Sequence, residues 1–127
     1  MSRIVFDASA LIAFIKDEPG GDRVRAVLGE AAISAVNFSE VIAKMTDFGR
    51  QGTEVERQLH RLQLEILAFT SEDARVAAAL RGPTRAAGLS LGDRSCLALG
   101  KRMDFPVLTA DRQWSDLPVD VKIELIR

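Results

Sequence analysis

The chain has 127 residues, of which 47% are hydrophobic and 28% are charged, and its formal net charge is −1. These values predict one folded domain over residues 1–127 and exclude an intrinsically disordered chain. No apolar run approaches the roughly 20 residues of a membrane span, and the near-neutral charge disfavours a passive nucleic-acid binder. The single cysteine excludes an intrachain disulfide, which is consistent with a cytoplasmic location.

The first strand is predicted from the run Ile4-Val5-Phe6, which has no polar alternation and stops at Asp7. Such a run is typical of a strand buried on both faces of a parallel sheet. In open α/β sheets, ligands bind at the carboxyl ends of strands, near the point where the strand order reverses. Asp7 is therefore a candidate for chemistry.

Short apolar segments alternate with helical patterns along the rest of the chain. Further strands are predicted at residues 31–34, 65–69 and 106–109, with an edge strand within 119–126. Helices are predicted at residues 10–16, 22–28, 37–50, 54–64, 71–80 and 93–102. Residues 81–90 are the longest candidate loop, with a partly helical segment as the alternative. This alternation favours a three-layer α/β/α sandwich with a mostly parallel central sheet.

Two acidic residues occupy similar settings at strand ends. Asp7 follows the first strand and Asp111 follows strand 106–109. Each has a hydroxyl two residues away, at Ser9 and at Thr109. If both strands are central and parallel, their carboxyl ends meet and bring the two carboxylates together.

Two helices supply further acids. Glu40 lies one turn into the helix that follows strand 31–34, and Asp93 opens the helix 93–102. Gly92 allows a close backbone approach beside Asp93, and Gly100 allows that helix to pack tightly on the sheet. All four acids are therefore expected at the same edge of the sheet.

A cluster of carboxylates has a definite chemical use. Packed carboxylates repel one another, and bound divalent cations offset the electrostatic cost of this repulsion. Oxygen ligands suit Mg²⁺ or Mn²⁺, and one histidine with one cysteine cannot build a tetrahedral zinc site. Two such ions support phosphodiester hydrolysis, with hydroxyls such as those of Ser9 and Thr109 orienting the carboxylates.

Each acid also has a simpler explanation as a helix cap. Asp7, Asp93 and Asp111 each stand where an N-cap is plausible, and Asn37-x-x-Glu40 resembles a capping box. Only the joint placement of the four favours a metal site, and the sequence leaves both explanations open.

Two other function classes compete with a metal-dependent hydrolase. A phosphate-accepting α/β domain would use Asp7 as a covalent nucleophile, although Ser9 stands where a second Asp is expected. A non-catalytic module would use the acids to bind a basic peptide. For a nuclease, Arg85, Arg94 and Arg112 lie beside the acid motifs and are candidates for contacting RNA phosphates.

Four segments, residues 4–11, 34–40, 88–94 and 106–112, together resemble the PIN-domain family in order and spacing. The resemblance is strongest to VapC-type toxins of bacterial type II toxin–antitoxin systems. It implies that Asp7, Glu40, Asp93 and Asp111 bind Mg²⁺ or Mn²⁺ and cleave RNA, leaving a 5′-phosphate and a 3′-hydroxyl. Ser9 and Thr109 match the usual hydroxyl positions of the family.

The same resemblance implies partners. A VapC-like protein is held inactive by a VapB-like antitoxin and tends to form a homodimer, with no membrane association. The helices 37–50 and 54–64 match the region that receives the antitoxin. Five apolar residues in these helices are either part of a docking surface or part of the core, and the sequence does not decide between the two: Phe38, Ile42, Phe48, Val55 and Leu59.

Overall fold

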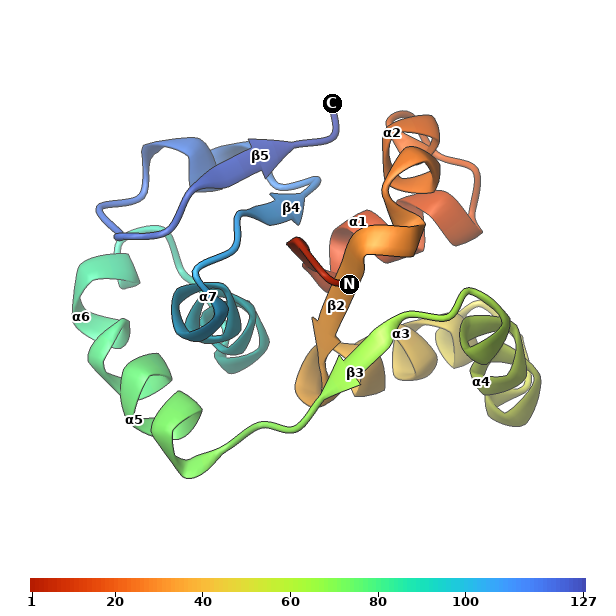
Figure 1. Cartoon of the computed structure of the whole chain (residues 1–127), viewed down its shortest axis with the longest axis horizontal. Helices are drawn as coiled ribbons and strands as arrows, with labels where there is room; N and C mark the ends of the chain where they lie inside the picture. Colours follow the sequence, from red (N-terminus) through yellow and green to blue (C-terminus); the bar gives the residue numbers. More distant parts are fainter.

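The computed structural model describes residues 1–127 and has a central sheet of five strands (Figure 1). The strands are β1 (Ile4–Phe6), β2 (Ala31–Ser34), β3 (Glu65–Leu67), β4 (Val107–Thr109) and β5 (Ile123–Leu125). Their spatial order is β3-β2-β1-β4-β5, and every neighbouring pair is parallel. The predicted α/β/α fold is confirmed, and the sheet is parallel throughout.

Helices cover both faces of the sheet. They are α1 (Ala8–Ile15), α2 (Gly21–Ala26), α3 (Ala35–Asp47), α4 (Gly52–Arg61), α5 (Ser71–Ala79), α6 (Arg81–Thr84) and α7 (Leu91–Met103), with 3-10 helices η1 (Leu28–Glu30) and η2 (Arg112–Asp116). Figure 1 shows α1 to α4 on one side of the sheet and α5 to α7 on the other. None of these helices combines the length and the apolar character that crossing a membrane requires.

The core consists of two apolar clusters because strand side chains alternate between the two faces. Ile4 and Phe6 belong to the larger cluster, with residues of α1 to α4. Val5 belongs to the smaller cluster, with residues of α7 and Val107. Every residue of β1 is buried, as its uninterrupted apolar run predicts.

Several element boundaries differ from the predicted ones for local reasons. Helix α7 begins at Leu91 because Ser90, and not Asp93, is its N-cap. Helix α4 ends at Arg61, three residues early, and Gln63 adopts a φ of 58° that no helix accommodates. Strand β5 is shorter than predicted because only residues 123–125 pair with β4.

Helix α7 packs closely on the sheet at Gly100. A Cβ atom there would lie 2.6 Å from Val107 Cγ2, which is closer than side chains tolerate. The tight packing expected at this glycine is therefore observed.

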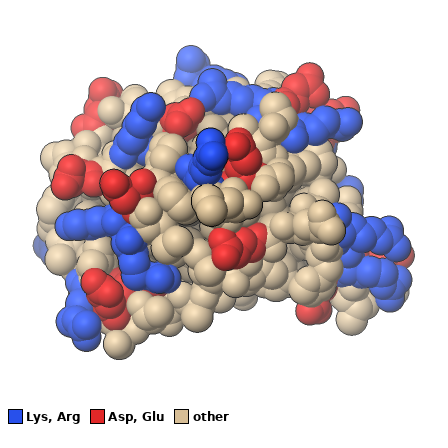
Figure 2. Space-filling view, viewed as in Figure 1, with Lys and Arg blue, Asp and Glu red and all other residues tan.

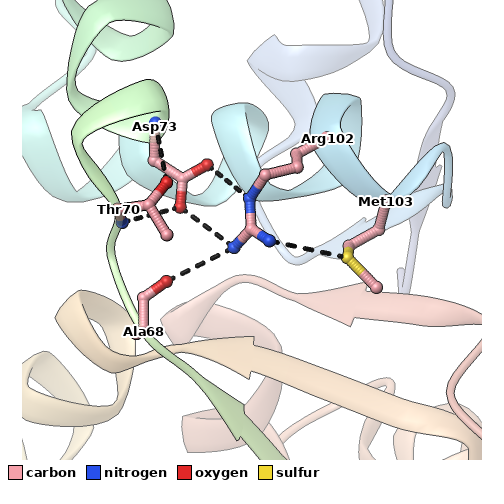
Figure 3. Close-up of polar contacts among 5 residues, drawn as sticks. All are labelled: Ala68, Thr70, Asp73, Arg102 and Met103. Carbon is pink, nitrogen blue, oxygen red and sulfur yellow. Dashed lines mark hydrogen bonds and ion pairs between the residues drawn. The ribbon is translucent and has the colours of Figure 1, made fainter.

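An ion pair fixes the other side of α7 (Figure 3). Arg102 donates from Nε to Asp73 Oδ1 at 2.7 Å and from Nη2 to Asp73 Oδ2 at 3.1 Å. The same guanidinium reaches Ala68 O at 3.3 Å, and Asp73 forms a capping box with Thr70. Arg102 thereby ties α7, which carries Asp93, to α5 and to the segment that leaves β3.

Candidate functional site

The four acids predicted from the sequence line one pocket of ≈ 300 Å³. Asp7 and Asp111 follow β1 and β4, Glu40 lies on α3, and Asp93 lies on α7. The chain runs from β1 outward to β3 and then returns to the other side of β1 as β4. The pocket therefore lies at the switch point where open α/β sheets bind ligands.

Two hydroxyls hold the carboxylate of Asp7. Its Oδ2 accepts hydrogen bonds from Ser9 Oγ at 2.5 Å and from Thr109 Oγ1 at 2.9 Å. The Thr109 hydroxyl also accepts a hydrogen bond from the Asp111 N–H at 3.1 Å. Because β1 and β4 are paired neighbours, Thr109 connects the two acids at their ends.

Glu40 is held by Asn37, which is fully buried. Asn37 Nδ2 donates to Glu40 Oε1 at 2.7 Å and to Gly92 O at 2.9 Å, and so joins α3 to α7. A Cβ atom on Gly92 would lie 2.5 Å from the Glu40 carboxylate, so only glycine leaves room there. The predicted capping role of Asn37 is wrong, because Ser34 is the N-cap of α3.

Asp111 is an N-cap, as predicted, and Asp93 is the third residue of the capping box that Ser90 begins, so both acids are held by a helix end and also line the pocket. Asp93 Oδ2 accepts a hydrogen bond from Ser90 N at 2.9 Å, and Asp111 Oδ1 accepts one from Gln113 N at 3.0 Å. Each of the four carboxylates thus has one oxygen fixed by the fold. The other oxygen has no protein hydrogen-bond partner: Asp7 Oδ1, Glu40 Oε2, Asp93 Oδ1 and Asp111 Oδ2.

Three of the acids interact electrostatically. The pKa of Asp7 is raised to about 6, mainly by burial; the hydrogen bonds from Ser9 and Thr109 oppose the rise, and the charges of Asp93 and Glu40 add to it. Burial also raises the pKa of Glu40, with Asp93 adding to the effect and the hydrogen bond from Asn37 opposing it. Asp111 is exposed at the rim. The pocket therefore concentrates negative charge, which Lys44 beside Glu40 offsets only in part.

The donor set fits a hard divalent cation. As they stand, no three His, Cys, Asp or Glu side chains lie close enough together to hold a metal ion. The pocket nevertheless offers only carboxylates among these types, and each of the four predicted acids has one free oxygen. Oxygen-only ligand sets suit Mg²⁺ and Mn²⁺. Asp7, Glu40 and Asp93, which interact electrostatically, are the side chains that could hold such an ion.

Basic and aromatic residues on the pocket rim were not predicted. Lys16, Lys44, Phe48 and Arg127 also line the pocket. Lys16 Nζ lies 3.5 Å from the centroid of the Phe48 ring, and Phe48 is 57% exposed. Lys44, one turn after Glu40 on α3, could have been found from its spacing, whereas Lys16, Phe48 and Arg127 follow the nearest acid by eight residues or more.

Of the three arginines predicted to contact RNA, Arg94 is buried in the protein. Arg94 is only 7% exposed, and its Nη1 donates to Ala77 O at 2.9 Å across the α5–α7 interface. It is therefore a packing residue that no phosphate can reach. Arg85 and Arg112 are exposed, but neither lines the acidic pocket.

The apolar residues of α3 and α4 are mostly core. Val55 and Leu59 are each 1% exposed, and Phe38 and Ile42 pack against the larger cluster. Of the five residues that the sequence left open, only Phe48 is exposed. An extended apolar docking surface on α3 and α4 is therefore absent.

A model of the PIN domain family matches residues 4–120, and the chain belongs to this family. Its fold resembles a toxin–antitoxin complex from Klebsiella pneumoniae, with 19% identity, a TM-score of 0.76 and 98% of each chain covered. It also resembles DNA-bound VapBC from Salmonella typhimurium, with 18% identity, a TM-score of 0.75 and 100% of each chain covered. A third similar structure is FitAcB from Neisseria gonorrhoeae, with 20% identity and a TM-score of 0.72; 94% of this chain and 95% of that chain are covered. A search of curated protein sequences found no match.

Proposed function

We propose that this PIN-domain protein is a divalent-metal-dependent endoribonuclease and the toxin of a toxin–antitoxin pair. The observation that carries the proposal is the pocket at the switch point of the sheet. Four carboxylates from four elements meet there, each with one oxygen fixed and one free. Such an arrangement is suited to a divalent cation, because each free oxygen is a ligand of the kind that Mg²⁺ and Mn²⁺ take.

The residues of the pocket have separable roles in this proposal. Asp7, Glu40 and Asp93 would hold the cation, and Asp111 would complete the set from the rim. A bound divalent cation would supply the positive charge that stabilises the phosphodiester as negative charge develops on it. Ser9 and Thr109 keep Asp7 oriented, and the rim lysines draw the negatively charged strand towards the acids.

The proposed partner is a VapB-like antitoxin, because several structurally similar proteins are described as toxin–antitoxin complexes. Two apolar side chains near the acid motifs are exposed: Phe48, which lines the acidic pocket, at 57%, and Leu91, two residues before Asp93 on α7, at 56%. They offer an antitoxin segment apolar contacts next to the carboxylates, in place of the wider surface expected on α3 and α4. A homodimer remains a further expectation of the family resemblance.

Asp93→Asn is the direct test of the nuclease. The free protein should cut total cellular RNA into discrete bands with Mg²⁺ or Mn²⁺, and chelator should abolish the cleavage. The D93N protein should lose at least about a hundredfold in rate, because one of the carboxylates that would hold the cation is removed. Asn retains an oxygen for the Ser90 N–H, so the capping box and the fold should persist.

Cleavage that survives both chelator and D93N would contradict the proposal. Folded protein that binds cations and cuts no RNA would favour a non-catalytic module. Adding the product of the neighbouring gene to the active enzyme tests the antitoxin, which should suppress cleavage.

Gly92→Ala should impair cleavage with little loss of stability. The new methyl group would meet the Glu40 carboxylate, whose flexible end can move, so Glu40 should leave Asn37 and the site. We expect a fall in kcat/KM of about 10–100-fold, as for other changes that misplace a ligand, and a change in unfolding free energy of under about 1 kcal/mol. Gly82→Ala is the matched control, because its Cβ would meet nothing within 4 Å. Equal activity of the two variants would show that the position of Glu40 is irrelevant.

A further inference from the structure

A groove of ≈ 830 Å³ lies on α4 and on the turn that precedes it. Its lining includes Arg50, Arg57 and Arg61, with Glu54 as the only acid. Its one apolar residue, Val55, is 1% exposed and belongs to the core. In Figure 2, blue side chains gather at the end of the molecule where Figure 1 shows α4.

The three arginines of this groove have no partners within the protein. None of them takes part in an ion pair, whereas Arg23, Arg102 and Arg127 each do. Arg57 and Arg61 stand four residues apart on one helix, where like charges destabilise by a few tenths of a kcal/mol, on the order of 0.2–0.5. The helix dipole favours a cation at Arg61, in the last turn of α4, but it does not explain Arg50 or Arg57.

The arginine groove adjoins the acidic pocket. Phe48 lines the acidic pocket, and the next residue, Gly49, lines the groove. The C-terminal end of α3 is thus a wall common to both. A strand that leaves the carboxylates in this direction passes the exposed ring of Phe48, on which a base can stack.

We propose that this groove binds the backbone phosphates of a single-stranded RNA whose cleaved phosphate lies at the acidic pocket. The inference rests on the proposed nuclease function and extends its substrate site by several nucleotides. Free guanidinium groups form strong paired hydrogen bonds with phosphate, and three of them in a polar groove match a run of phosphates. A protein segment fits less well, because docked segments bury apolar anchors and the groove offers no apolar pocket.

The test compares R57Q/R61Q with R3Q/R75Q, which also removes two exposed, unpaired arginines. Both pairs are placed in the D93N protein, and binding of a fluorescent 20-nucleotide single-stranded RNA is followed by anisotropy from about 50 to 300 mM KCl. R57Q/R61Q should bind at least about tenfold more weakly. Its slope of log K against log salt should fall by about 1.4, from two lost contacts at about 0.7 each. R3Q/R75Q should leave the slope unchanged.

The same pairs are then placed in the otherwise unaltered enzyme and assayed on long RNA with Mn²⁺. R57Q/R61Q should raise KM with kcat retained, because the arginines position the strand and do not touch the reacting atoms. Equal salt slopes for the two pairs would overturn the proposal. So would retained RNA binding together with lost binding of an oligoglutamate peptide, which would assign the groove to an acidic protein partner. Arginine-dependent RNA binding by a wild-type protein that cuts no RNA would support the groove and refute the nuclease.

Discussion

Asp7→Asn should abolish RNA cleavage and make the metal-free protein more stable. Burial raises the pKa of Asp7 from 3.8 to about 6, so at pH 7 the folded protein carries a charge that it disfavours. A shift of about two pH units corresponds to about 3 kcal/mol of unfolding free energy. Asn keeps an oxygen acceptor for the hydroxyls of Ser9 and Thr109 but carries no charge. We expect a gain approaching this value in chemical denaturation with chelator present.

The gain from D7N should depend on pH in a defined way. Below about pH 4, Asp7 is protonated in both the folded and the unfolded chain. The wild type and D7N should then have nearly equal free energies of unfolding. As the pH rises from about 4 to about 6, the unfolded chain ionises first, so the wild type loses stability that D7N retains. Above about pH 6 the difference should be constant.

Asp111→Asn is the control for this experiment. Asp111 lines the same pocket but is exposed, so its substitution should reduce cleavage without stabilising the fold. A D7N protein that is no more stable than wild type at pH 7, or a gain that persists at pH 4, would contradict the assigned burial cost. Added Mg²⁺ should narrow the difference, because only the wild type keeps the full ligand set.

Arg102→Gln should destabilise the protein by about 2–3 kcal/mol at pH 7. Loss of one partner from a buried ion pair costs about 3–5 kcal/mol, and the partial exposure of Arg102 reduces this figure. Asp73, which is 2% exposed, would keep its negative charge after the arginine is lost. Only the hydrogen bond from the Thr70 N–H and a small contact with solvent would then stabilise that charge. Urea denaturation of the two proteins measures the loss.

The pKa of Asp73 defines the pH window of this effect. Burial raises this pKa, but the hydrogen bonds from Arg102 and Thr70 outweigh burial, and the net shift is downward. The contribution of the pair is therefore complete above the unfolded pKa of about 3.8 and is lost as the pH falls through the folded pKa. The cost of R102Q should shrink correspondingly in acid.

Arg23→Gln is the matched control, because it breaks an ion pair of similar length in an exposed setting. Arg23 Nη2 lies 2.9 Å from Glu124 Oε1, with the arginine side chain 52% exposed. Exposed pairs contribute about 0–1 kcal/mol. Equal losses for R23Q and R102Q would show that the burial of Asp73 contributes nothing.

The fold was predictable because its signals are local. The run Ile4-Val5-Phe6 needs both faces covered, and short apolar strands alternating with helices admit few topologies. Asp7 and Asp111 could be placed together for the same reason, since each directly follows a strand. Element ends were less predictable, because Ser90 rather than Asp93 caps α7 and the difference depends on one hydroxyl.

The parts that could not be predicted depend on contacts between distant segments. Asn37 looks like a cap beside its neighbours, and only the presence of Gly92 O, 55 residues away, shows what it does. Arg94 looks like a phosphate contact until α5 places Ala77 O against it. For Val55 and Leu59 the sequence left surface and core equally open, and their burial in the larger apolar cluster shows that they are core. In each case the deciding neighbour belongs to another element, distant in the sequence.

The hydrogen bond between Thr109 and Asp7 spans 102 residues of chain, and this separation has a consequence for synthesis. A ribosome makes β1 first and β4 near the end, so a nascent chain has Asp7 but lacks the strand that orients it. Contacts of such long sequence separation form late in folding. The acidic pocket therefore cannot assemble on a chain that lacks β4. The proposed antitoxin would accordingly have to act only on a chain in which β4 has been made.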